Sequence, residues 1–319
     1  MKFKKHSMQK ESRVLVTGAN GFVGRHLCAY FEKYQIQIRK AIREDDSRKN
    51  EAYEVGDICG TTYWGPILSE INCVVHLAGL VHVLEEKSAN PLASFRVVNV
   101  DGTINLARQA VRAGVKRFIF LSSIKVNGEK TEGNPFCADD TPAPSDPYSM
   151  SKLEAEKALF RLGKKTGLEV VVIRPPMVYG PAAKGNFSRL VWLVQNMKVL
   201  PFGNVKNKRS LLYVNNLCDL ILHCIYHEKA AGQVITACDT HDLSTPELIH
   251  LIAKCLHTKC YLFPMPINLL LLWGQLLGKN AEISRLTESL QIDHDEVKRK
   301  IGWHPPVKVN EAFIRSIVV

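Results

Sequence analysis

The sequence has no apolar run long enough to cross a bilayer. Its longest apolar segment, residues 267–277, is shorter than the roughly 20 residues that a transmembrane helix needs. This segment predicts a buried or interface helix, with peripheral membrane contact as the alternative. The N-terminal residues are polar and basic with no apolar stretch after them, so no signal peptide is visible and a cytoplasmic location is expected.

Paired cysteines and metal-ligand patterns are also missing. The nine cysteines contain no C-x-x-C pair, which argues against a disulfide framework and for a reducing compartment. His223 and His227 lie close in sequence, as do Cys255, His257 and Cys260, but neither set has a second pair at ligand spacing. The sequence therefore predicts no metal site and assigns these residues to helix faces or to the core.

Basic residues are in excess, but they do not form a stripe. The chain has 42 Lys and Arg against 31 Asp and Glu, a formal charge of +11. Their scatter along the sequence argues against a nucleic-acid surface and leaves a solvated face or a polyanionic small substrate. With 319 residues and 46% hydrophobic content, the chain is long enough to bury a full core.

The order of elements predicts an α/β fold. Short β-branched runs alternate with helical patterns, which is typical of βαβ units and a parallel sheet. Strands are expected at residues 14–17, 36–42, 73–77, 117–122 and 169–173, and helices at 22–31, 95–113 and 148–165. After Arg174 many prolines interrupt shorter segments. We expect a Rossmann-type doubly wound parallel sheet, mainly a dinucleotide-binding domain over residues 1–174, and mainly a substrate-binding region over 175–319, with a cleft between them.

A glycine-rich turn follows the first predicted strand and opens the first predicted helix. Glycines allow a tight turn and a close approach to a pyrophosphate, and the free N–H groups at the helix start hold its charge. The spacing is G-x-x-G-x-x-G rather than G-x-G-x-x-G. The residues predicted to bind the dinucleotide here are Gly18, Asn20, Gly21, Phe22, Val23 and Gly24.

The cofactor's ribose is normally read about 20 residues later, by an acid for NAD or by a base for NADP. Arg43 near the end of the second predicted strand tilts the prediction slightly toward NADP, although a solvated charged loop is an equal alternative. Asp57 and Ile58 are expected to lie near the adenine. A plain turn aspartate is the alternative for Asp57.

Tyr148 and Lys152 are four residues apart, so both project from one face of a helix. A cation beside a tyrosine favours the phenolate and lowers the tyrosine pKa, which suits an acid/base acting on a sugar hydroxyl. Alone, this pair equally indicates a surface contact. Together with the glycine turn and with Ser123 after a predicted strand, it becomes specific.

These motifs together resemble the extended short-chain dehydrogenases/reductases, in the nucleotide-sugar epimerase/dehydratase group. Further matches are the sequences His-Leu-Ala-Gly at 76–79, Leu-Ser-Ser at 121–123 and Arg-Pro-Pro-Met-Val-Tyr-Gly-Pro at 174–181. The resemblance implies that Ser123 holds the reacting hydroxyl, Tyr148 is the acid/base, and Lys152 binds the nicotinamide ribose and tunes the tyrosine. Asn99 would support the helix that carries them. Further cofactor contacts are implied for Leu77, Ala78, Gly79 and Pro175.

The resemblance also implies substrate contacts. Arg209 would grip the nucleotide diphosphate, Asn186 and Phe187 would touch uracil and phosphate, and Lys125 would lie beside the substrate. A solvated basic loop or a helix start is the alternative for these positions. Asn127 stands where relatives commonly have a tyrosine.

The segment after Ser123 has no carboxylate, which disfavours a dehydratase. The resemblance implies an NAD(P)-dependent 4-epimerase of UDP-hexoses or UDP-N-acetylhexosamines, similar to UDP-glucose 4-epimerases, acting through a 4-keto intermediate. One alternative is a 4-reductase of a UDP-4-keto-6-deoxy-N-acetylhexosamine, which Arg43 would favour if it reads a 2′-phosphate. Another is a non-catalytic, dinucleotide-sensing protein. A homodimer is expected through the helices at 95–113 and 148–165.

Overall fold

The computed structural model describes residues 13–44, 52–81, 90–183 and 185–317; the basic residues at the start of the chain lie outside them. The strands are β1 (Val14–Thr17), β2 (Ile38–Ile42), β3 (Ala52–Glu54), β4 (Cys73–His76), β5 (Arg117–Leu121), β6 (Glu169–Arg174), β7 (Met177–Tyr179), β8 (Val199–Leu200), β9 (Leu211–Tyr213), β10 (Val234–Thr236) and β11 (Tyr261–Leu262).

The larger α-helices are α1 (Phe22–Lys33), α4 (Thr103–Arg112), α5 (Pro147–Thr166), α6 (Asn186–Asn196), α7 (Val214–Tyr226), α8 (Thr245–Cys255), α9 (Ile267–Leu276), α10 (Asn280–Thr287) and α12 (Val309–Ile317). Shorter helices are α2 (Gly65–Leu68), α3 (Pro91–Arg96), α11 (Glu296–Ile301), the π-helical η1 (Val97–Gly102) and the 3₁₀ turns η2 (Ile124–Val126) and η3 (Glu228–Ala230).

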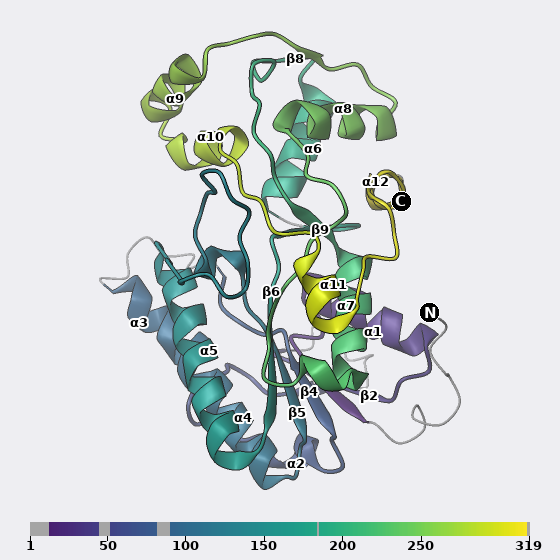
Figure 1. Ribbon diagram of the computed structural model, residues 1–319. Coiled ribbons are helices and arrows are strands. Elements are labelled where there is room, and N and C mark those ends of the chain that lie inside the picture. Colours follow the sequence, from purple (N-terminus) through teal and green to yellow (C-terminus); the bar gives the residue numbers. More distant parts are fainter. Residues whose placement is uncertain (1–12, 45–51, 82–89, 184, 318–319) are drawn as a thin grey trace.

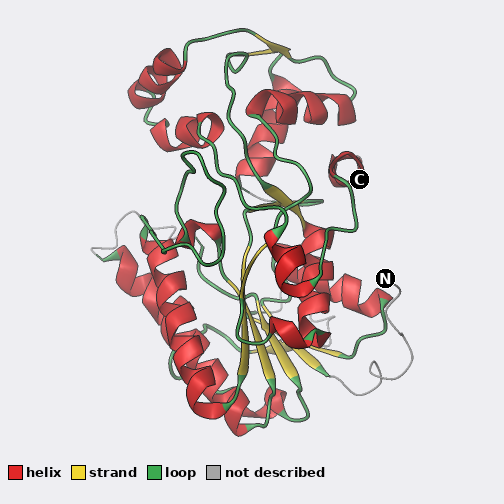
Figure 2. Cartoon of the chain, viewed as in Figure 1, coloured by secondary structure: helices red, strands yellow, loops and turns green. Residues whose placement is uncertain are grey.

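The central sheet is parallel and doubly wound. Its strand order is β10-β6-β5-β4-β1-β2-β3, and every pairing is parallel. The order reverses between β1 and β4, so the connections leave these two neighbouring strands toward opposite edges of the sheet. Figure 2 shows the strands between helices on both faces. The predicted fold class is confirmed, and ligands of such sheets bind at this reversal point, outside the carboxyl ends of the strands.

Alternation along the strands explains the two helical layers. Val14 and Val16 point to one face, where they meet Leu27 and Phe31 of α1, whereas Leu15 points to the other face. The second layer comprises α2, α4 and α5, which contribute buried residues to the same cluster as Leu15. Because both faces are covered, the central strands β1, β4, β5 and β6 are mostly apolar rather than alternating with polar residues.

The helix predicted over residues 95–113 is longer and less regular than expected. It begins at Pro91, capped by the Asn90 side chain, and passes through the π-helical η1 before continuing as α4. A π-helical turn adds a residue to the helix and is frequent at functional sites. Here it carries Asn99, one of the predicted site residues.

The smaller lobe is built from residues after Arg174, but not all of those residues join it. β10 pairs with β6 in the central sheet, and α7 packs against α1 on its face. α11 lies beside β10, whereas α6, α8, α9 and α10 form the upper lobe in Figure 1. The division at residue 174 therefore stays a prediction.

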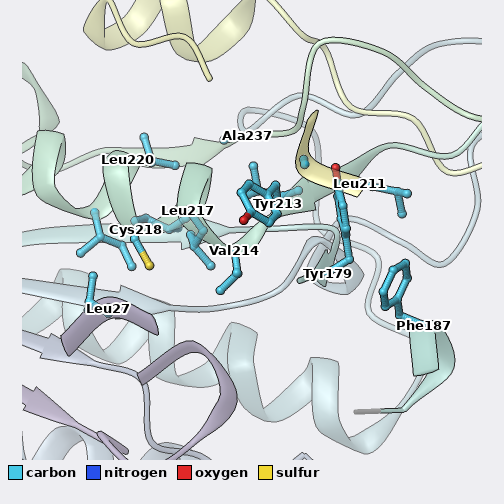
Figure 3. Packing of buried hydrophobic residues seen from close by; sticks show 14 of the residues in the cluster. Leu27, Tyr179, Phe187, Leu211, Tyr213, Val214, Leu217, Cys218, Leu220 and Ala237 are labelled. Atoms are coloured by element: carbon cyan, nitrogen blue, oxygen red, sulfur yellow. The ribbon is translucent and has the colours of Figure 1, made fainter. Parts of the chain in front are cut away.

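A continuous core joins the two lobes. Tyr179 of β7 packs with Phe187 of α6 and Tyr213 of β9, at ring-centroid separations of 5.5 and 5.7 Å. Figure 3 shows these rings running on into Val214 and Leu217 of α7, which faces α1. The smaller lobe is thus anchored on the sheet through buried side chains rather than through a linker.

The apolar segment at 267–277 forms α9, and it is not buried. Only Leu270 and Gly274 of this helix are buried. Of the two predicted settings the buried helix is therefore wrong, and the interface helix stays a prediction. Among the described residues, no helix is long and apolar enough to cross a membrane.

The histidine and cysteine sets take part in ordinary packing. The rings of His223 and His227 stack with centroids 4.7 Å apart, and the nine cysteines are free thiols. Within the described ranges, no group of three or more His, Cys, Asp or Glu residues is placed to hold a metal ion.

Candidate active site

The glycine turn lies between β1 and α1, as its spacing predicts. Gly18 has a φ of +65°, and a Cβ there would lie 2.9 Å from the amide nitrogen of Ala78. A Cβ on Gly24 would lie 2.1 Å from the carbonyl oxygen of Gly18. The helix begins after Gly21, and no described side chain caps its first N–H groups. These residues therefore fit a dinucleotide pyrophosphate, which needs close backbone approach and free donors at a helix start.

A network of buried hydrogen bonds holds β4 beside this turn. The two ring nitrogens of His76 lie 2.7 Å from the Thr17 hydroxyl and 2.9 Å from the Thr103 hydroxyl, and the Ala78 amide donates to Thr17. Burial lowers the pKa of His76 to about 3, and the charge of Lys152 adds to this effect. A neutral histidine therefore links the ends of β1 and β4 to α4.

Gly79, Asn99 and Lys152 meet just beyond β4. The Asn99 amide group accepts from the Leu80 N–H at 2.8 Å and donates to the Leu80 carbonyl and to the Ser151 hydroxyl, both at 3.0 Å. A Cβ on Gly79 would lie 3.1 Å from Asn99 Oδ1 and 3.3 Å from Lys152 Nζ. Asn99 thus ties the segment after β4 to α5, between Tyr148 and Lys152.

Lys152 is buried at the end of β5. Its ammonium donates to the Leu121 carbonyl at 2.9 Å and lies 4.4 Å above the centre of the Phe120 ring. Burial lowers the pKa of Lys152 to about 8. The sequence explains this position because α5 turns the same face toward β5 at Tyr148, Lys152 and Glu156.

The predicted lowering of the Tyr148 pKa is wrong for this geometry. Burial, with a smaller contribution from Asp146, raises the pKa of Tyr148 to about 12. The Lys152 ammonium lies 6.0 Å from the centre of the Tyr148 ring and is bound to the Leu121 carbonyl, so desolvation outweighs its attraction. The ring itself packs edge-on against Phe95, with centroids 6.0 Å apart.

The segment with Ser123 is fixed to the start of α5. Ser123 begins the 3₁₀ turn η2, and its hydroxyl accepts from the Lys125 N–H. The Lys125 ammonium donates to Asp146 at 2.6 Å and to Glu129 at 2.9 Å. Asp146 is the N-cap of α5, two residues before Tyr148. In this geometry Lys125 serves as a brace between the serine segment and the tyrosine helix.

A buried ion pair under the site was not predicted. Glu156, 2% exposed, accepts from Arg174 at 3.1 and 2.5 Å and from the Ser122 hydroxyl. Arg174 also donates to Asn127, whose amide donates to the Cys137 carbonyl. The signal was a glutamate one turn after Lys152, on the face that carries the site. Pro175 continues this support, since its carbonyl accepts from the Ile124 N–H.

Arg43 and Asp57 form an ion pair with each other. The Arg43 Nε and an Asp57 carboxylate oxygen are 2.6 Å apart, and both side chains are exposed. Ile58 packs on the helix beside them, since a Cβ on Gly102 would lie 2.5 Å from its side chain. The sequence treated Arg43 as a free base that reads a phosphate, whereas the fold gives it a carboxylate partner.

The predicted substrate residues of the second region lie in different settings. Asn186 opens α6, whereas the Phe187 ring is 4% exposed and packs in the core. The predicted contact of these two residues with uracil and phosphate stays a prediction, and the burial of the ring leaves the backbone of Phe187 for it. Arg209 pairs through its backbone with Leu243, and its guanidinium donates to the Glu288 carbonyl at 3.1 Å. Burial lowers the pKa of Arg209, and the carboxylates of Glu288 and Glu129 oppose this effect.

The chain is similar to known proteins over most of its length. It is 46% identical to a UDP-glucose 4-epimerase of Vibrio cholerae, over 94% of this chain and 93% of that protein. A GDP-6-deoxy-D-mannose reductase of Pseudomonas aeruginosa is 28% identical, over 96% of both chains.

The fold is also that of a solved structure, a UDP-glucuronic acid 4-epimerase from Bacillus cereus in complex with NAD. The TM-score is 0.76 at 19% identity, over 96% of this chain and 97% of that one. The model of the NAD dependent epimerase/dehydratase family matches residues 14–238, which include the glycine turn, Asn99, Ser123, Tyr148 and Lys152. The resemblance inferred from the motifs is therefore confirmed, and the chain belongs to the NAD-dependent epimerase/dehydratase family.

Proposed function

We propose that the chain is a nucleotide-sugar 4-epimerase that acts on a UDP-hexose or a UDP-N-acetylhexosamine through a transient 4-keto sugar. The observation that carries this proposal is the meeting of Gly79, Asn99 and Lys152 at the end of β5, one helical turn from Tyr148. This meeting brings the Tyr148–Lys152 pair close to the glycine turn, near the reversal point of the sheet. The 46% identity to a UDP-glucose 4-epimerase supports this chemistry.

Three side chains take part in the proposed proton transfer. Tyr148 takes the proton of the sugar hydroxyl while Ser123 holds that hydroxyl. A dinucleotide held at the glycine turn would supply the hydride acceptor and donor for the sugar carbon. Lys152 opposes the cost of forming a phenolate in a buried setting, where the pKa of Tyr148 is about 12. After the keto sugar turns over, Tyr148 returns the proton to the oxygen, so the reaction leaves no net redox change.

We propose NAD rather than NADP as the cofactor. The 2.6 Å pairing of Arg43 with Asp57 supports this choice, because the pair is neutral and its carboxylate would repel a 2′-phosphate. The NADP prediction from sequence treats Arg43 as unpaired, whereas Asp57 neutralises it in the fold. The glycine turn, with its uncapped helix start, would hold the pyrophosphate.

The direct test is to incubate the purified protein with UDP-glucose and with UDP-N-acetylglucosamine. Each reaction is run with and without catalytic NAD or NADP, and the sugar nucleotides are resolved by NMR. We expect the C4 epimer to accumulate without net consumption of cofactor. Turnover of neither sugar would overturn the proposal.

Tyr148→Phe isolates the acid/base in this assay. We expect this variant to lose about 10²–10⁴-fold in rate. Its fold should persist, because the ring keeps its contact with Phe95. Tyr63→Phe, at a 77% exposed position, is the matched control and should keep the full rate.

The 4-reductase alternative has less support than the epimerase. Arg43 favours a reductase only if it binds the 2′-phosphate of NADPH, and its pairing with Asp57 weakens that interpretation. The similarity to a GDP-6-deoxy-D-mannose reductase still supports the alternative. Stoichiometric oxidation of NADPH by a 4-keto-6-deoxy sugar nucleotide, with no epimerisation of UDP-glucose, would select it. A Tyr148→Phe variant with unchanged biological behaviour would instead select the non-catalytic sensing protein.

We also propose a homodimer, a cytoplasmic location and the division of labour near residue 174. The dimer would form through the helix of α3, η1 and α4 together with α5, which expose Val97 and Met150 at 47% and 38%. Light scattering at micromolar concentration tests it, and a monomer mass would contradict it.

A further inference from the structure

The proposed epimerase chemistry makes no use of α9, whose outer face is apolar. The helix places five large apolar side chains at the spacing i, i+3, i+4, i+7 and i+8, which forms one stripe along a helix. Such a stripe ordinarily faces a core. Here all five side chains are 46–77% exposed: Leu269, Leu272, Trp273, Leu276 and Leu277.

The packing of α9 against α10 holds this stripe outward. Leu270 and Gly274 are its two buried residues, and they lie along one edge of the stripe, about 110° around the helix from its centre. A Cβ on Gly274 would lie 3.0 Å from the Ile283 side chain, so the two helices approach closely at this glycine. Rotating α9 to bury the stripe would break that contact. The stripe is thus a built feature of the folded chain.

Further exposed apolar side chains lie on β11, which precedes α9 in the chain, and on its partner strand β8. β11 leads into α9 and pairs with β8, and the two strands with their flanking residues add four exposed side chains, Met197, Val199, Tyr261 and Phe263. These four side chains, Ile267 and the five residues of the stripe are together named the outer apolar patch. It holds 10 of the 17 large apolar side chains that are exposed in the described part of the chain. Figure 1 places β8 and α9 at the outer end of the smaller lobe, away from the sheet.

The stretch of chain that carries β11 and α9 has charge of one sign. The sequence contains no acidic residue between Glu247 and Glu282, whereas Lys254, Lys259 and Lys279 lie in that interval. A symmetric contact with a second copy would bring these lysines against one another. An anionic lipid surface would instead receive the apolar side chains among its acyl chains and pair its head groups with the lysines.

We propose that the outer apolar patch docks the protein on the surface of an anionic lipid bilayer. Tryptophan and leucine on one side of a helix flanked by lysines are typical of helices that lie in the membrane interface. The contact is peripheral and requires no spanning segment. It gives the enzyme a place to work at the membrane without changing the residues of its active site.

Flotation of the full chain with lipid vesicles tests this proposal. The vesicles are phosphatidylcholine alone, or equal parts of phosphatidylcholine and phosphatidylglycerol. We expect binding to the anionic vesicles, weakened at high salt, and at least about tenfold weaker binding to phosphatidylcholine alone. The triple variant Trp273→Ser, Leu276→Ser, Leu277→Ser should bind anionic vesicles at least about tenfold less than the wild type.

The matched control replaces two exposed apolar residues outside the patch. Tyr63→Ser with Ile314→Ser, at positions 77% and 54% exposed, should bind vesicles as the wild type does. Both variants should turn over soluble nucleotide sugar at the wild-type rate, which separates this test from that of the proposed function. Absence of vesicle binding by the wild type, or equal loss in the control variant, would overturn the proposal. So would a wild-type oligomer that the triple variant dissociates without any vesicle binding, because the patch would then join copies of the chain.

Discussion

Replacing Glu156 with glutamine should destabilise the fold far more than its distance from the reacting groups suggests. Glu156 and Arg174 have side chains 3% and 4% exposed, and they meet at 2.5 Å beneath the site. The variant keeps the shape of the side chain and removes its charge. Arg174 is then left as a buried cation without a counter-charge, which costs about 3–5 kcal/mol in the free energy of unfolding.

The same argument predicts how a second change behaves. In the double variant Glu156→Leu, Arg174→Met both charges are gone, and the pair is replaced by apolar side chains of similar size. Such replacements are often close to neutral. The Ser122 hydroxyl and the Asn127 carbonyl lose a partner, at about 1–3 kcal/mol each. The double variant should therefore lose much less free energy of unfolding than Glu156→Leu and Arg174→Met lose when their separate losses are added.

Urea unfolding followed by the fluorescence of the four tryptophans measures these differences, provided that the slope with urea stays constant. Glu154→Gln is the matched control, because it lies two residues away on α5 in an exposed pair with Arg96. It should cost less than about 1 kcal/mol. The reasoning fails if Glu156→Gln costs as little as this control, or if the double variant is as unstable as the two single variants added together.

Three further predictions concern the glycine turn and the residues near it. Because the pKa of His76 is about 3 in the folded chain and about 6.5 when unfolded, stability should fall as the pH drops from 6.5, by up to about 1.4 kcal/mol per unit. His76→Gln should remove that part of the slope in urea titrations between pH 6.5 and 4.5, and an unchanged slope would contradict it. Gly24→Ala should weaken NAD binding at least about tenfold by calorimetry, since its Cβ would lie 2.1 Å from a carbonyl oxygen of the turn, whereas Gly60→Ala, with 3.5 Å of space, should bind normally. Asp57→Ala should release Arg43 and raise the affinity for NADP relative to NAD about tenfold, and the same ratio as in the wild type would argue against their pairing in solution.

Local patterns were enough to predict the fold and several residues that meet beside the glycine turn. The strand at residues 14–17, the glycine turn and the helix after it depend on neighbours in sequence, so spacing alone located them. Parallel strands put their carboxyl ends on one edge of the sheet, which is why residues that follow different strands were expected to meet. Asn99, Ser123, Tyr148 and Lys152 all lie at or beside the carboxyl ends of β4 and β5.

The electrostatics of the site depended on contacts between distant residues. Tyr148 and Lys152 are neighbours on a helix face, but how deeply they are buried and which carbonyl holds the lysine depend on β5, more than 20 residues earlier in the chain. The charge state around Arg43 also depends on a distant residue, because its partner Asp57 follows β3 in the sequence. The sequence shows which ionisable residues are present. Their pKa values and ion-pair partners depend on distances between residues in the folded chain and on how far burial removes water from them.

The amino-acid sequence thus established the order of elements, the doubly wound sheet and the types of residue at its reversal point, because these follow from periodicity and from glycine geometry. Tertiary packing decided which groups are buried together. It turned Glu156 toward Arg174, enclosed Phe187 in the core and left the apolar stripe of α9 outside. The physical reason is that periodicity shows that a helix has an apolar face, while only the neighbours of the helix determine whether that face is covered.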